Sequence, residues 1–166
     1  MARIIAHCAG VRAVVRHVHG RIVESSHSVT TSIQMPFADG VIACSQAVAD
    51  SIAGDRTEVI FSGIEIGVQP PPSPSQNGPL KIGVLSRLIP LKNVEAVIEA
   101  TAQLIHNKVN VTLEIAGTGP SEPMLRKLVT RLGLNENVSF LGWRQDVMPL
   151  LASWDLLAMP SVDEGL

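Results

Sequence analysis

The chain has 166 residues, of which 46% are hydrophobic and 17% are charged, and its formal net charge is -2. This apolar content excludes an intrinsically disordered chain, and the balanced charge excludes a general nucleic-acid binder, which needs a concentrated basic surface. No apolar run approaches the roughly 18 residues of a membrane span and no signal-peptide segment begins the chain, so we expect a soluble, cytoplasmic protein with reduced cysteines, Cys8 and Cys44.

Valine-rich runs and helix stop signals indicate the elements of the first part of the chain. Gly10 ends a helix, the run after it is typical of a strand, and the Ser45 hydroxyl can cap the start of a later helix. The expected elements are a helix end over 2–9, strands over 11–18, 41–44 and 58–61, and a helix over 45–52.

A proline-rich segment divides the chain. Residues 69–79 contain five prolines and show no apolar periodicity. Proline fixes φ and lacks the N–H donor, so this segment can be neither a helix nor a central strand. We therefore predict an exposed linker over 67–79, between a first domain over 1–66 and a second over 80–166.

After the linker, apolar runs of strand length alternate with helical periodicity. The expected strands span 80–85, 109–116, 138–141 and 156–159, and the expected helices span 93–107, 121–132 and 145–151. Such alternation predicts βαβ units and an α/β fold with a parallel sheet. Ligands of parallel sheets bind at the carboxyl ends of the strands, so the loops that follow the strands are the candidate sites.

The first two of these loops suit a phosphate ligand. Arg87 and Lys92 precede a helix start, whose free N–H groups and partial positive charge favour a diphosphate. Gly117 and Gly119 permit a sharp turn and close approach to a ligand. Taken singly, the cations read as ordinary surface residues and the glycines as a tight turn. The GxGxxG pattern fails at Glu122, which disfavours a nicotinamide-dependent dehydrogenase.

The next two loops are weaker signals. Gly142 and Trp143 offer a place for a nucleobase, although Trp143 could equally be a core or rim aromatic residue. Glu164 stands beside a glycine after the last strand, where it could hold sugar hydroxyls or simply belong to a surface turn.

Cationic side chains gather near the start of the chain. Arg3, Arg12, Arg16 and Arg21 all precede the first acidic residue, which indicates either a solvated edge or a surface for an anionic acceptor or an acidic membrane face. For His17 and His19 we expect the two imidazoles to be split between the faces of a strand, which argues against a metal site.

The order of these signals resembles the donor-binding domain of retaining glycosyltransferase family 4, the glycosyl transferases group 1, with a two-domain GT-B fold. The matching motifs are Ser-Arg-Leu-x-Pro-x-Lys, Gly-Thr-Gly-Pro, Leu-Gly-Trp and Pro-Ser-x-x-Glu-Gly, each after a predicted strand. Similarity to family segments of the acceptor-side domain continues upstream, over residues 18–20, 41–45 and 59–65. The resemblance therefore covers nearly the whole chain.

The resemblance implies a role for each candidate residue. Arg87 and Lys92 would hold the diphosphate of a UDP- or GDP-linked sugar and stabilise its leaving charge, without a cofactor or metal. Glu164 would contact the transferred sugar, and His19 would lie near the reaction centre. Gly117, Gly119, Gly142 and Trp143 would line the nucleotide site. The partners would be a nucleotide-sugar donor and a glycan or lipid-linked acceptor, with no nucleic acid.

Some positions depart from the family pattern. Asn93 and Ser62 replace a usual glycine and asparagine, and a second family glutamate would fall after Leu166. We therefore expect a truncated piece, inactive alone, of a hexosyltransferase of bacterial envelope or exopolysaccharide synthesis that works in the cytoplasm or at the inner membrane face. The alternative is an inactive nucleotide-binding or scaffold remnant. An incomplete sheet also predicts a homodimer through its exposed edge.

Overall fold

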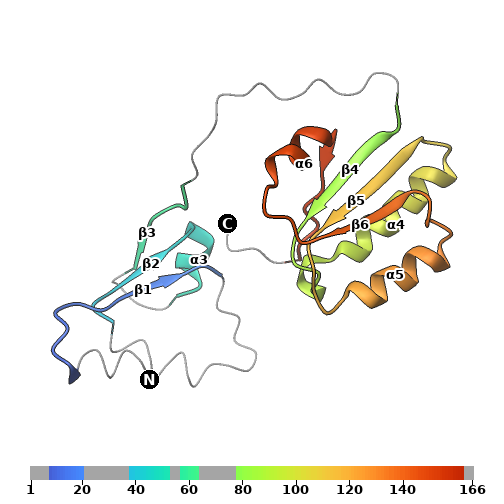
Figure 1. Cartoon of the computed structure of the whole chain (residues 1–166). Helices are drawn as coiled ribbons and strands as arrows, with labels where there is room; N and C mark the ends of the chain where they lie inside the picture. The colour runs from blue at the N-terminus through green and yellow to red at the C-terminus, as the bar shows by residue number, and fades with distance from the viewer. Residues whose placement is uncertain (1–7, 21–37, 53–56, 64–77, 163–166) are drawn as a thin grey trace. The chain divides into compact units, whose positions relative to one another are not determined.

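The computed structural model describes residues 8–20, 38–52, 57–63 and 78–162 (Figure 1). Two compact units divide the chain, one from Met1 to Gly67 with Glu164–Leu166, the other from Val68 to Asp163. Each unit is described by itself. Most of the helix end predicted over 2–9 and the proline-rich stretch up to residue 77 lie outside the described residues.

Within its described residues, the first unit contains a small parallel sheet and a short helix. Strands β1 (Val15–Val18), β2 (Gly40–Ala43) and β3 (Thr57–Val59) lie in the order β1-β2-β3, and both pairs are parallel. Helix α3 (Gln46–Asp50) begins after Ser45, whose Oγ accepts a hydrogen bond from Val48 N at 3.3 Å, as predicted for the cap. The strand expected over 11–18 is shorter, because pairing with β2 begins only at Val15.

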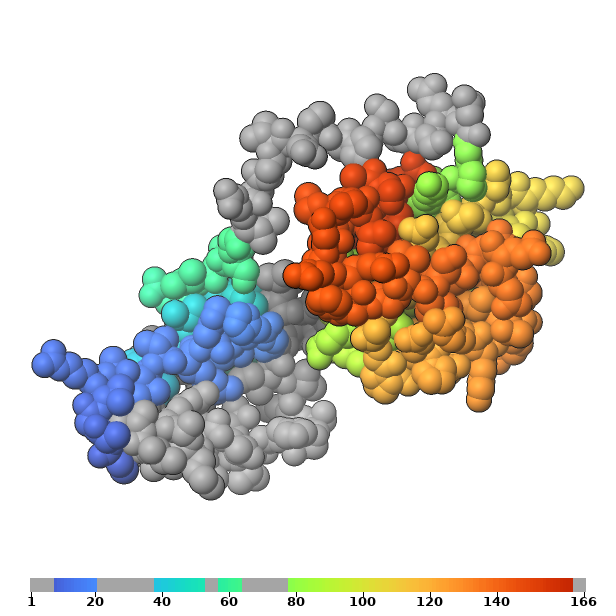
Figure 2. Space-filling model, in the orientation of Figure 1, coloured from blue at the N-terminus to red at the C-terminus, as the bar shows by residue number. Residues whose placement is uncertain are grey.

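The second unit contains a four-stranded parallel sheet. Its strands are β4 (Leu80–Leu85), β5 (Val111–Ala116), β6 (Val138–Gly142) and β7 (Leu156–Leu157), in the order β6-β5-β4-β7. The connecting helices are α4 (Val94–His106), α5 (Glu122–Arg131) and α6 (Met148–Ser153), with a short 3-10 turn η2 (Pro90–Lys92) before α4. The predicted α/β class with parallel sheets is thus confirmed, and this unit fills one packed body in Figure 2 (green to red).

Helices α4 and α5 cover one face of this sheet. Alternate strand residues, among them Ile82, Val84, Leu113 and Ile115, pack with buried side chains of both helices. Strand side chains alternate between faces, so Gly83 and Glu114 belong to the opposite face, on the side of α6 (Figure 1). Burial of the aliphatic side chains on the helix-covered face is the main stabilising contribution of this unit.

The opposite face is closed over Gly83 by Trp154. The Trp154 indole Nε1 donates to a Glu114 carboxylate oxygen at 2.7 Å, and the side chain is almost fully buried. The next residue, Asp155, fixes β7 to the start of β4: its carboxylate accepts from Lys81 N at 2.8 Å and its own N–H donates to Lys81 O at 2.9 Å. These contacts connect segments more than seventy residues apart.

Candidate functional site

The loops that follow β4, β5 and β6 form one pocket of about 230 Å³. It lies at the carboxyl ends of adjacent parallel strands, where parallel sheets bind their ligands. The lining residues are Leu85, Ser86, Arg87, Ala116, Gly117, Thr118, Trp143 and Arg144. Three of the predicted site residues, Arg87, Gly117 and Trp143, therefore meet in one place.

Backbone hydrogen bonds join the first two loops. Ser86 N donates to Ala116 O at 3.1 Å, and Leu88 N donates to Thr118 O at 2.9 Å. Leu88 O in turn accepts from Ser121 N at 2.9 Å, and the Leu88 side chain is fully buried in the core of this unit. Arg87 is thus an exposed residue whose backbone is held between two anchored neighbours.

Gly117 is required where the two loops touch. Its φ is +135°, which side chains rarely adopt, and a Cβ atom there would fall 1.8 Å from Ser86 O. Its N–H donates to Gly142 O at 2.8 Å, which joins the loop after β6 to the other two. Gly117 therefore brings all three loops together at the pocket.

The other two predicted glycines, Gly119 and Gly142, shape the loops around the pocket but do not line it. A Cβ atom on Gly119 would lie 2.3 Å from Leu88 O, so Gly119 allows the loops to pack. Gly142 has φ +69° and closes a β-bulge, because Ala116 pairs with Gly142 directly after Ile115 pairs with Phe140. Neither residue lines the pocket. The bulge redirects the chain immediately before Trp143.

Two arginines give the pocket its charge. Arg144 follows Trp143 and joins Arg87 in the lining, whereas the lining includes no aspartate or glutamate. Trp143 is 68% exposed, which is unusual for so large an aromatic surface. Cations without a lining carboxylate favour an anionic ligand, and the free indole offers a flat surface for a ring.

The sequence did not predict Ser86, Thr118 or Arg144 as site residues. All three directly flank residues that it did predict, since Ser86 precedes Arg87, Thr118 follows Gly117 and Arg144 follows Trp143. The position of each loop after a strand was the available signal, and weighing every residue of the loop would have found them.

Lys92 ends η2 and does not line this pocket. The next residue, Asn93, has φ +48° and ψ +37°, in the left-handed region that favours glycine and asparagine. That conformation explains why asparagine is tolerated where the family pattern has glycine.

His19 belongs to the first unit, whereas every residue of the pocket belongs to the second. The rings of His17 and His19 lie 3.9 Å apart, centroid to centroid. The expectation that the two imidazoles are split between opposite faces is wrong, because alternate residues of an extended chain share a face.

Glu164 lies outside the described residues. Within the described part of the chain, no cluster of three or more His, Cys, Asp or Glu residues could hold a metal ion. No helix in the same residues is long and apolar enough to cross a membrane.

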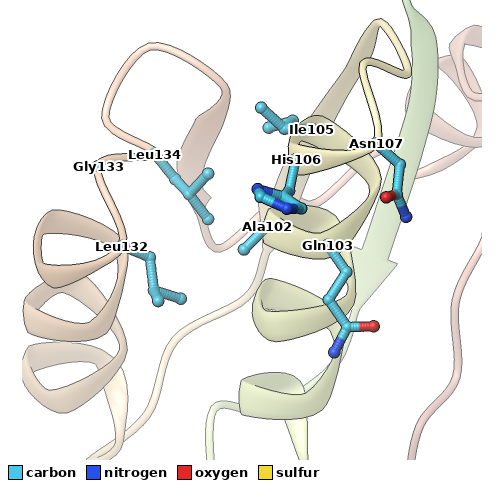
Figure 3. Close-up of a pocket in the computed structure, with 8 residues that line it drawn as sticks. All are labelled: Ala102, Gln103, Ile105, His106, Asn107, Leu132, Gly133 and Leu134. Atoms are coloured by element: carbon cyan, nitrogen blue, oxygen red, sulfur yellow. The ribbon is translucent and has the colours of Figure 1, made fainter.

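A second pocket, of about 560 Å³, lies between the carboxyl-terminal ends of α4 and α5. Figure 3 shows Leu132 and Leu134 facing Ala102 and His106 across it. A crossover helix runs from the carboxyl end of one strand to the amino end of the next. The second pocket therefore lies at the amino ends of the strands, whereas the first pocket lies at their carboxyl ends. None of the predicted site residues lines it.

Residues 67–166 match a family model described as glycosyl transferases group 1. Over 82 residues the chain is 39% identical to a GDP-mannose-dependent monoacylated alpha-(1-6)-phosphatidylinositol monomannoside mannosyltransferase of Corynebacterium glutamicum, covering 48% of this chain and 21% of that protein. It is 37% identical over 82 residues to the lipopolysaccharide core biosynthesis glycosyltransferase LpsE of Rhizobium meliloti, covering 49% and 23%. The chain thus spans about a fifth of the length of these curated relatives.

Among solved structures, the fold is similar to Anabaena HepE in complex with UDP and glucose, with a TM-score of 0.80 and 29% identity. The match covers 96% of this chain and 49% of that chain. TarM of S. aureus, in complex with UDP, alpha-GlcNAc-glycerol and Fondaparinux, has a TM-score of 0.73 at 18% identity, covers 91% of this chain and 32% of that chain, and supports the fold alone.

Proposed function

Because this chain belongs to the glycosyl transferases group 1 family, we propose that the whole protein transfers a hexose from a nucleotide-sugar donor to a glycan or lipid-linked acceptor. The transfer retains the anomeric configuration, as in family 4 of the GT-B enzymes. Residues 80–166 form the first half of the donor-binding domain, and residues 1–66 belong to the acceptor-side domain, with a linker between them.

One observation carries the proposal: Arg87, Gly117 and Trp143 line a single pocket at the carboxyl ends of β4, β5 and β6. The three residues come from loops up to 56 positions apart, yet each was predicted from its place after a strand. An arginine, a close-packed glycine turn and an exposed indole suit the phosphates, backbone and base of a nucleotide.

The donor is a hexose linked to UDP or GDP. The Corynebacterium relative is named for its use of GDP-mannose, and Anabaena HepE was solved with UDP and glucose. The relative LpsE, which is named for lipopolysaccharide core biosynthesis, supports the proposal that this protein acts in bacterial envelope or exopolysaccharide assembly.

The chemistry of this proposal is stabilisation of the leaving nucleoside diphosphate. Arg87 and Lys92 balance the negative charge that develops on the diphosphate as the bond to the sugar breaks, in place of a metal ion. Glu164 holds the sugar hydroxyls, and His19 acts from the acceptor side near the reaction centre. The protein works in the cytoplasm or at the inner membrane face, and the cationic residues in the first stretch of this chain offer a surface for an anionic acceptor.

Ligand-observed NMR on the chain tests the proposal, with UDP, GDP, ADP and NAD as separate probes. We expect UDP or GDP to bind, and Arg87→Ala and Lys92→Ala to weaken that binding about tenfold each, the loss typical of a charge-assisted hydrogen bond. Lys127→Ala is the matched control, since Lys127 is an exposed cation within α5 and belongs to none of the loops that directly follow β4, β5 and β6, whereas Lys92 belongs to the loop after β4.

The outcomes separate the two functional classes. Equal effects of all three substitutions would mean that only general charge matters. A folded chain that binds none of the four nucleotides would contradict the donor-domain proposal and favour the catalytically inactive remnant.

A further inference from the structure

Ser86 has a side chain whose hydrogen-bonding capacity is unused. Its Oγ is buried and has no hydrogen-bond partner among the described residues. Most buried polar side-chain atoms in proteins are hydrogen-bonded, and an unsatisfied one costs free energy. An unpaired hydroxyl in a folded protein therefore calls for a physical reason.

The position of Ser86 suggests that reason. Ser86 lines the pocket at the carboxyl ends of β4 to β6, directly beside Arg87. Arg144 lines the same pocket, and no aspartate or glutamate does. Ser86 thus lines a small cavity whose ionic side chains are all cationic, and a ligand suited to this cavity brings anionic acceptors.

The backbone of Ser86 is fixed from both sides. Its N–H donates to Ala116 O at 3.1 Å, and its carbonyl oxygen packs against Gly117, where even a Cβ atom would collide with it. With the backbone fixed, the side-chain Oγ of Ser86 can move only by rotation about the Cα–Cβ bond, which has three staggered positions. Rotation about this bond is therefore the movement by which the hydroxyl can turn toward a ligand in the pocket.

We propose that the Ser86 hydroxyl is a donor for a phosphate oxygen of the bound nucleoside diphosphate. This inference rests on the proposed function of the pocket. A phosphate oxygen accepts hydrogen bonds and cannot donate them, so it complements both the hydroxyl and the two guanidinium groups. Ser86, Arg87 and Arg144 would then surround the diphosphate from two different loops.

The proposal predicts effects of opposite sign for one substitution. In the ligand-free chain, Ser86→Ala removes an unsatisfied buried hydroxyl, and the melting temperature should stay equal or rise by a few degrees. In the complex the same change removes a charge-assisted hydrogen bond, and nucleotide binding should weaken about tenfold. A serine with a purely structural role would give a lower melting temperature and unchanged binding.

The experiment makes three measurements on the unaltered chain and on each of three single variants, Ser86→Ala, Arg87→Ala and Ser139→Ala. Ser139 is exposed on β6 and outside the pocket, so its variant controls for the loss of a hydroxyl. Melting temperatures are measured without ligand, affinities for UDP and GDP by titration calorimetry, and the 31P shifts of the bound nucleotide by NMR. We expect Ser86→Ala, unlike the control Ser139→Ala, to combine weaker binding with undiminished stability, and to shift a bound 31P resonance.

The possible failures are distinguishable. If UDP or GDP binds and Arg87→Ala weakens it while Ser86→Ala does not, the Ser86 inference is overturned and the proposed function stands. A lower melting temperature of ligand-free Ser86→Ala, or unchanged 31P shifts despite weaker binding, would also overturn it. If neither nucleotide binds the unaltered chain, the proposed function itself falls, and the assignment of Ser86 falls with it.

Discussion

The indole of Trp154 lies directly against Gly83, so that a Cβ atom added to Gly83 would fall 1.9 Å from the ring. Gly83 is an interior residue of β4, where a glycine weakens a strand unless something needs the space. A glycine inside a strand often marks a close approach by another part of the structure. The neighbour is an aromatic ring from seventy-one residues later in the chain.

We expect Gly83→Ala to destabilise the second unit by about 1–3 kcal/mol, the usual cost of overpacking a core. The added methyl group must displace a buried indole that is also hydrogen-bonded to Glu114. Urea unfolding followed by Trp fluorescence measures the change. Gly40→Ala is the control, because a Cβ atom there meets nothing within 4 Å, and equal losses in the two variants would contradict the packing argument.

The hydrogen bond between Trp154 and Glu114 should be visible as an energetic coupling. Trp154→Phe keeps most of the ring but leaves the partly buried carboxylate without this donor, which should cost about 1–3 kcal/mol. Glu114→Leu removes the partner, so the double variant should lose less stability than the sum of the two single variants. A double-mutant cycle from urea unfolding checks this, and simple additivity would show that the 2.7 Å contact contributes nothing.

Gly117→Ala should abolish nucleotide binding and should also lower the free energy of unfolding of the second unit. The substitution combines an unfavourable φ of +135° with a collision against Ser86 O, in the turn that joins all three loops. Gly133→Ala is a matched control, since Gly133 also has a positive φ, +70°, but has open space around it. The control should lose only about 1–2 kcal/mol. Binding titrations on both variants decide the point, and retained binding in Gly117→Ala would contradict the loop geometry.

Strand β7 is the place where we expect self-association. It is the last strand in the order β6-β5-β4-β7, and Leu156 and Leu157 are 51% and 41% exposed. An exposed apolar edge strand favours pairing with a second copy, and a charge on it opposes pairing. Light scattering after gel filtration should show dimers that increase with concentration and decrease in Leu156→Lys. A monomer at every concentration would exclude this edge as an interface.

The alternation of strand and helix patterns was sufficient to predict the fold of the second unit. Apolar periodicity is a local property, and a chain that alternates between periods of two and 3.6 residues can bury its apolar faces in few ways. The same logic placed Arg87, Gly117 and Trp143 together, because parallel strands put all of their following loops at one edge. The separation expected for His17 and His19 was an error of strand geometry, which the sequence itself could have corrected.

Other features depended on contacts between distant segments. The bulge that closes at Gly142 depends on the register between β5 and β6, and the close packing of Gly119 against the Leu88 backbone depends on how two loops meet. Neither leaves a periodic signal, because each depends on a distance that only the assembled sheet defines.

The sequence by itself therefore determined the class of fold, the order of the loops and the cations that they carry, since these follow from local pattern and from the rule that parallel strands share an edge. Only the tertiary structure decided that Lys92 does not line the pocket and that Arg144 and Ser86 do. It also decided that the Ser86 hydroxyl has no hydrogen-bond partner among the described residues. Those facts depend on side chains packed across loops, and packing is set by close contacts that no single segment contains.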